Sequence, residues 1–129
     1  MKNLLSITAI LGALAVALGA FGAHGLQELV TADRIEIFRT GSRYHFYHLV
    51  PLFVAAGALI SDYGQPKWLG WSARLFLGGL LLFSGSLYLL AFRDLVSLNI
   101  GWLGTITPLG GLLFIGGWLC LAKGLINKT

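Results

Sequence analysis

The chain has 129 residues, of which 57% are hydrophobic and only 11% are charged. A soluble domain usually carries about a quarter charged residues, so too little polar surface remains here to cover a water-exposed globule. Disorder is excluded as well, because a disordered chain contains few apolar side chains. Nine Lys and Arg against five Asp and Glu give a formal charge of +4. Since the basic residues are scattered singly, we expect no nucleic acid partner. The composition indicates an integral membrane protein whose main partner is the lipid bilayer.

Four apolar runs predict four transmembrane helices, over about residues 4–23, 44–61, 75–92 and 102–122. A helix rises about 1.5 Å per residue, so about twenty residues cover the roughly 30 Å core of a bilayer. All charged residues lie outside these runs, as expected if a charge at the bilayer centre costs several kcal/mol. The predicted fold class is an all-α, integral membrane four-helix transmembrane bundle that forms one domain over residues 1–129.

Two segments admit more than one interpretation. The first run follows Lys2 and ends in small residues, as a secretory signal peptide does, but it exceeds the usual apolar length of about 7–15 residues. Residues 24–43 form an amphipathic connector in which Thr31 is a candidate helix cap and Asp33 is favourable in the first turn. This connector is expected either to lie in the membrane interface or to pack on the bundle as a helical loop.

A glycine pattern recurs in three of the runs. Each contains Leu-Gly-small-Leu, with a second glycine seven residues after the first. Seven residues return to nearly the same helix face, and glycine there lets two helix backbones approach closely. The pattern predicts packing contacts, in the bundle interior or between protomers of a homo-oligomer, although chance is the alternative in a chain rich in Gly and Leu. The predicted packing glycines are Gly12, Gly19, Gly78, Gly85, Gly110 and Gly117.

Polar side chains collect near one end of the predicted spans, and all three histidines lie there. Arginine and histidine suit an anionic or quinone-like head group, which makes a lipid or another small molecule a candidate ligand. The alternative is a polar interface that caps helix ends, with arginines reaching toward lipid phosphates. The candidate polar site consists of His24, Arg43, Tyr44, His48 and Arg93.

Motifs of familiar chemistry are absent from the sequence. It contains no G-x-S-x-G, no phosphate-binding glycine loop, no C-x-x-C and no H-E-x-x-H. The single cysteine, Cys120, lies in an apolar run and is expected to act as a small hydrophobic residue. Because no H-x-x-x-H pair occurs, we predict no metal or haem site. Because the motifs above are absent, we predict no cofactor and no catalytic residue.

Four stretches, residues 12–26, 38–50, 81–91 and 104–119, resemble the YgdD-type family of small four-span bacterial membrane proteins, a domain of unknown function. A small eukaryotic transmembrane protein resembles this family too. The resemblance implies a multi-pass inner-membrane protein with no established activity, and it supplies no catalytic residue. His45 departs from the family pattern, which has glutamine there, so His24 and His48 are the better site candidates. The matching residues are Gly22, His24, Gly25, Thr40, Gly41, Arg43, Tyr44, Tyr47, His48, Ser84, Gly85, Ser86, Tyr88, Thr107, Pro108 and Gly110.

We therefore expect a small inner-membrane protein that is non-catalytic and acts through helix packing, lipid or partner contacts. One alternative is an oligomeric channel or transporter for a small solute or ion, which would use the few polar residues within the spans. Another is a lipid- or quinone-binding membrane protein with its polar site near one interface. The polar residues available to a solute pathway are Ser84, Ser86, Thr105 and Thr107.

Overall fold

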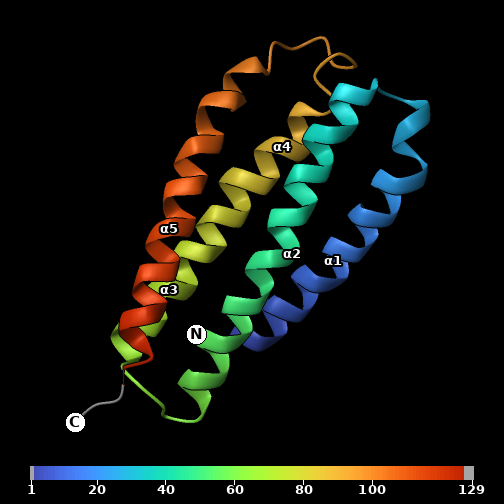
Figure 1. Ribbon diagram of the computed structural model, residues 1–129. Coiled ribbons are helices and arrows are strands. Elements are labelled where there is room, and N and C mark those ends of the chain that lie inside the picture. The colour runs from blue at the N-terminus through green and yellow to red at the C-terminus, as the bar shows by residue number, and fades with distance from the viewer. Residues whose placement is uncertain (1, 127–129) are drawn as a thin grey trace.

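Four helical stretches run alternately in opposite directions, so the start of α1 and the end of α5 lie at the same end of the molecule (Figure 1). The computed structural model describes residues 2–126 and contains no strand in that range, which confirms the all-helical class. The ends of the predicted domain 1–129 lie outside the described residues. The helices are α1 (Leu4–His24), α2 (Ala32–Ile60), α3 (Pro66–Gly79), α4 (Gly85–Leu90) and α5 (Ile106–Gly124). A π-helical segment, Leu80–Ser84, joins α3 to α4, and 3₁₀ turns occupy Leu26–Glu28 and Gly101–Thr105.

Helix α2 begins well before the apolar run that predicted it. The sequence placed a connector over residues 24–43 and a span from Tyr44, whereas α2 is continuous from Ala32. Charged side chains are compatible with a helix, and two of its arginines pair with carboxylates. Arg43 reaches Glu36 on the same helix, and Arg34 reaches Asp94 after α4, both at 2.9 Å. These charges end the apolar surface without ending the helix, so the helix extends back beyond the apolar run to Ala32.

Three stretches are long and apolar enough to cross a membrane: Leu4–His24, Pro66–Leu90 and Gly101–Gly124. The second of these begins at Pro66 and not at Leu75, because proline is well tolerated in the first helical turn. Helix α2 is not among the three, since its first half carries the charged and polar residues described above. Spanning length and composition are thus established for three of the four predicted crossings.

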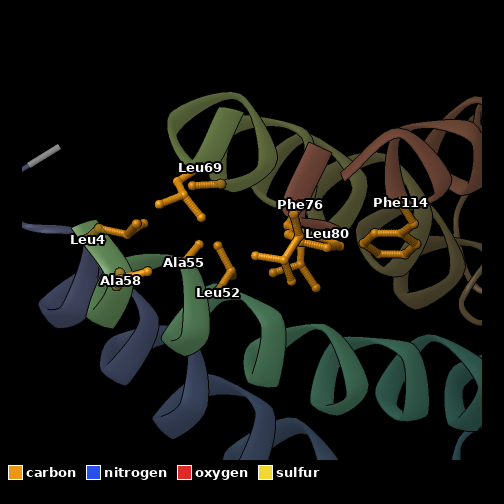
Figure 2. Packing of buried hydrophobic residues seen from close by; sticks show 11 residues of the cluster. Leu4, Leu52, Ala55, Ala58, Leu69, Phe76, Leu80 and Phe114 are labelled. Atoms are coloured by element: carbon orange, nitrogen blue, oxygen red, sulfur yellow. The ribbon is translucent and has the colours of Figure 1, made fainter. Parts of the chain in front are cut away.

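The main core lies where α2, α3 and α5 meet. Leu52 and Ala55 of α2 face Leu69 and Phe76 of α3, and Figure 2 shows these side chains between the helices. Phe114 of α5 belongs to the same buried cluster. Burial of such side chains within the chain fixes α3, α5 and α2 as neighbours.

Helix α1 lies at the edge of the molecule. Its backbone approaches α2 and no other long helix among the described residues, and Figure 1 shows α1 and α5 on opposite sides. Near its end, Phe21 stacks on Phe92 at 6.2 Å, above a small second core that contains Phe38. Toward the start of α1, this helix and the α3–α4 stretch are separated, and α2 lies at the base of the gap between them.

Candidate functional site

The five residues of the predicted polar site do not converge. Tyr44 and His48 lie together, with their rings stacked at 5.9 Å. His24 is exposed at the end of α1, and Arg43 is exposed and paired with Glu36. Arg93 is exposed after α4. Tyr44 and His48 line a cavity with a volume of about 460 Å³, which lies between α2 and α5 beside Phe83.

Both ring nitrogens of His48 are engaged within the chain. Nδ1–H donates to the carbonyl oxygen of Tyr44 at 2.7 Å, and the indole N–H of Trp118 donates to Nε2 at 3.2 Å. This pattern requires the neutral tautomer with its proton on Nδ1. The imidazole also stacks on Phe114, with centroids 3.6 Å apart and planes inclined by 7°. His48 therefore joins α2 to α5 and keeps no ring nitrogen free for a ligand.

A second cavity, of about 330 Å³, lies between α1 and the α3–α4 stretch. We call it the α1 groove. Its polar lining residues are His45, Ser84 and Tyr88, and no charged residue lines it. The rest of its wall is hydrocarbon and glycine, from Ile7, Leu11, Leu14, Leu18, Leu77, Leu80, Leu81 and Gly85.

Two buried polar atoms in the α1 groove have no hydrogen-bond partner. His45 Nδ1 lies 2.8 Å from the hydroxyl of Tyr88, but His45 Nε2 has no partner among the described residues. The backbone of Leu11 on α1 lies close enough to the His45 ring to act as a hydrogen-bond partner, at a looser geometry than the Tyr88 contact. The hydroxyl oxygen of Ser84 is buried and unpartnered in the same way. A buried polar atom left unpaired costs about 1–3 kcal/mol, so two in one groove call for an explanation.

The π-helical segment Leu80–Ser84 sets the direction of the residues that follow it. Its wider turn is closed by the N–H of Gly85, which donates to the carbonyl oxygen of Leu80. An inserted π turn rotates the next helix relative to the one before. Consequently Gly78 faces Leu113 of α5, whereas Gly85 lines the α1 groove. Turns of this kind are frequent at functional sites.

The other predicted packing glycines lie between helices of this chain. A Cβ atom at Gly110 would overlap the backbone of Phe83, and one at Gly117 would lie 2.9 Å from the ring of Phe76. Gly12 and Gly19 face α2 at looser distances, with 3.8 Å and 3.6 Å to the nearest side-chain atoms. The close approach of α5 to the α3–α4 stretch therefore depends on the absence of side chains at Gly110 and Gly117.

Sequence reasoning missed the α1 groove. It set His45 aside as a departure from the family pattern, and it considered Ser84 only as part of a solute pathway. The available signal was the spacing of Ser84 and Tyr88, which are four residues apart and share a helix face. Nothing in the sequence says that this face meets His45.

Ionic contacts lie at the periphery of the fold. Arg34 donates to both carboxylate oxygens of Asp94, at 2.9 and 3.4 Å. This hydrogen-bonded guanidinium holds the pKa of the Asp94 carboxyl below its usual range. Within residues 2–126, no group of three or more His, Cys, Asp or Glu side chains is placed to hold a metal ion.

The comparisons with known proteins all indicate the same family. Residues 18–111 match the family model described as "Protein of unknown function (DUF423)". The chain is 42% identical over 129 residues to "UPF0382 membrane protein YwdK" of Bacillus subtilis, covering 98% of each chain. It is 42% identical over 125 residues to "UPF0382 membrane protein" of Haemophilus influenzae, covering 96% of this chain and 94% of the relative.

"UPF0382 inner membrane protein YgdD" of Escherichia coli is 37% identical over 126 residues, covering 98% of this chain and 91% of the relative. These matches confirm the family resemblance that the sequence motifs indicated. No solved structure matches the chain.

Proposed function

Because this chain belongs to the DUF423 family, whose relatives named above are membrane proteins, we propose a four-crossing inner-membrane protein with a non-catalytic role. It acts through helix packing and through contacts with lipid or a membrane-borne partner. The two termini lie on the same side of the membrane in this arrangement.

The observation that carries the proposal is the apolar surface of all four helical stretches. Ile10 of α1, Val50 of α2 and Leu119 of α5 are each more than 60% exposed, and Leu81 of the π-helical segment is 72% exposed. Side chains of this size and number need hydrocarbon around them, since large contiguous apolar surfaces are rare on soluble monomers. Helix α2 shares this surface, which supports its inclusion as the fourth crossing.

The charges of α2 are compatible with a crossing. The side chain of Arg43 extends back along the helix to Glu36, two turns nearer the helix start. A long basic side chain that reaches toward the interface keeps its charge hydrated while its stem covers apolar surface. The charged first half of α2 can thus extend beyond the bilayer core while its second half crosses.

Self-association belongs to the same proposal. Gly110 and Gly117 face other helices of the same chain, so a contact between protomers would use the exposed apolar faces. In detergent, light scattering is therefore expected to give a protein mass larger than that of a single chain. The alternative of a solute pathway gains no support from the α1 groove, whose wall is almost entirely hydrocarbon.

The crossings are tested with a membrane-impermeant maleimide. In a Cys120→Ser background, single cysteines replace Asp62, between α2 and α3, or Ser97, between α4 and α5. Four crossings predict that the two positions are labelled from opposite sides of sealed vesicles, and that Gln27→Cys is labelled together with position 97. Labelling of position 27 from the same side as position 62 would contradict the proposal, because α2 is the helix that separates these two positions.

A further inference from the structure

We propose that the end of the molecule where α3 begins and α5 ends binds the head group of an anionic phospholipid through Lys67, Arg74 and Lys123. We call these three cations, together with Trp68 and Trp71, the basic patch. The inference deepens the lipid contacts of the proposed function and rests on the membrane crossings, because a bilayer presents a layer of phosphates to this end of the molecule.

The positive charge of the chain is concentrated at the end that carries the basic patch. At the opposite end, basic and acidic residues balance: Arg34, Arg39, Arg43 and Arg93 against Glu28, Asp33, Glu36 and Asp94. Two of those arginines form ion pairs with carboxylates at 2.9 Å. At the end of the basic patch, within residues 2–126, one acid stands against several bases: Asp62 against Lys2, Lys67, Arg74 and Lys123. The fold therefore leaves an excess of cations at this end.

The cations of the basic patch lie over indole rings. Lys123 Nζ is 4.0 Å from the ring centroid of Trp68, and Lys67 Nζ is 5.9 Å from the same ring. The guanidinium carbon of Arg74 is 5.4 Å from the ring centroid of Trp71. Neither ion pair found among residues 2–126 includes these three side chains, and all three are exposed. A cation over a ring face keeps its N–H groups available to an anion, so an external phosphate can complete the site.

The surroundings of the basic patch suit a phospholipid. Tryptophan prefers the interface between water and hydrocarbon, where the head groups lie. Lys67, Trp71 and Arg74 are spaced four and three residues apart and share a face of α3. Arg74 points back toward the start of α3, since its Nη1 would lie 3.9 Å from a Cβ atom on Gly70. Further along the same helical stretch, Leu81 is 72% exposed. A ligand on this surface meets cations first and hydrocarbon beyond them, as a phosphate followed by acyl chains requires.

The excess of cations favours a lipid with a net negative charge. A zwitterionic head group brings its own ammonium group, which would add a positive charge to a patch that already lacks counter-charges. Each Lys or Arg near an anionic lipid surface contributes an attraction that corresponds to about fivefold in affinity. We therefore expect phosphatidylglycerol to bind more tightly than phosphatidylethanolamine.

The test is native mass spectrometry of the full-length protein in a neutral detergent. The probes are phosphatidylglycerol and phosphatidylethanolamine with identical acyl chains, each titrated in ammonium acetate. Phosphatidylglycerol should bind at least about fivefold more tightly. This preference should shrink as ammonium acetate rises from about 50 to about 500 mM, because salt screens exposed charges. Inorganic phosphate at the concentration of the lipid should not displace phosphatidylglycerol, because it lacks acyl chains.

Substitutions locate the site. Arg74→Gln or Lys123→Gln should each weaken phosphatidylglycerol binding about fivefold, with a smaller effect on phosphatidylethanolamine. Lys123→Arg keeps the charge and should bind as the unmodified chain does. Arg39→Gln is the matched control, because Arg39 is exposed near the opposite end and neither ion pair of residues 2–126 includes it. It removes the same charge and should leave binding unchanged. Circular dichroism of each variant confirms that it is folded.

Four results would overturn the inference: equal affinity for the two lipids, no effect of Arg74→Gln and Lys123→Gln, an equal loss with Arg39→Gln, or displacement of the lipid by inorganic phosphate. The last result would identify a site for small anions and not for a lipid. The maleimide labelling pattern depends on the crossing helices and not on these side chains. Failure of this inference is therefore distinguishable from failure of the four-crossing proposal.

Discussion

A close approach between two helix backbones predicts a large effect of a very small substitution, Gly110→Ala. Gly110 of α5 lies against the backbone of the π-helical segment. A Cβ atom there would lie 2.8 Å from the Cα of Phe83 and would overlap its backbone nitrogen, whereas ordinary van der Waals contact begins at 3.4 Å. One methyl group must therefore push α5 away from the α3–α4 stretch.

The magnitude follows from which atoms collide. Overpacking a well-packed interior costs about 1–3 kcal/mol. The upper end applies here, because the obstructing atoms belong to a helix backbone and cannot rotate aside as a side chain would. A loss of about 3 kcal/mol corresponds to roughly a hundredfold change in the unfolding equilibrium constant.

The assay is reversible unfolding in mixed micelles, followed by circular dichroism as the fraction of denaturing detergent increases. Gly57→Ala provides the matched control, since Gly57 is also helical but has nothing within 4 Å of its Cβ position. Alanine is favoured over glycine inside a helix by about 0.5–1 kcal/mol, so this control should be neutral or slightly stabilised. If Gly110→Ala unfolds at the same detergent fraction as Gly57→Ala, the packing of α5 described above is incorrect.

Further substitutions test three other contacts. His48→Phe keeps the stack on Phe114 but leaves the indole N–H of Trp118 unpaired, so it should destabilise by about 1–3 kcal/mol in the same unfolding assay; Trp118→Phe in that background should then cause little further loss. Ser72→Ala removes a buried 2.9 Å hydrogen bond to the carbonyl oxygen of Gly117, and a loss of about 0.5–1.5 kcal/mol is expected. Because Arg34 lowers the pKa of Asp94 in the folded state, its contribution is present above the ordinary aspartate range and is lost as pH falls through the lowered value. Asp94→Asn should therefore flatten the acid limb of a stability–pH profile, and an unchanged limb would contradict the pairing.

Apolar runs predicted the helical class and the approximate position of each helical stretch, because a bilayer-length hydrophobic segment has few other structures available. They did not predict the start of α2. An apolar run marks the part of a helix that needs hydrocarbon around it. Helix α2 begins earlier, at Ala32, and its first turns carry charged residues, of which Arg34 pairs with Asp94 and Arg43 with Glu36.

The glycine spacing predicted contacts by assuming an uninterrupted α-helix. That assumption holds for Gly110 and Gly117 of α5, which both face the α3–α4 stretch. It does not hold for Gly78 and Gly85, because the π-helical segment between them rotates the second glycine toward the α1 groove. A single π turn has no dependable sequence signal, so this difference was not predictable.

The roles of the histidines could not be read from the sequence either. His45 and His48 are three residues apart in the same run, and their sequence surroundings are alike. Their difference arises from partners on other helices, since Trp118 completes the bonding of His48 while Tyr88 engages only one nitrogen of His45. Hydrogen bonds to residues that are distant in the sequence can be identified only from the three-dimensional structure.

The central claim is that hydrocarbon surrounds all four helical stretches, and α2 is the stretch that tests it most directly. A spin label at Val50, which is exposed on α2, is compared for collision with molecular oxygen and with a water-soluble nickel complex in proteoliposomes. The four-crossing arrangement predicts that oxygen dominates at Val50 as strongly as at Ile10 of α1. Preferential collision with the nickel complex at Val50, alongside oxygen preference at Ile10, would show that α2 lies outside the bilayer and would contradict the account.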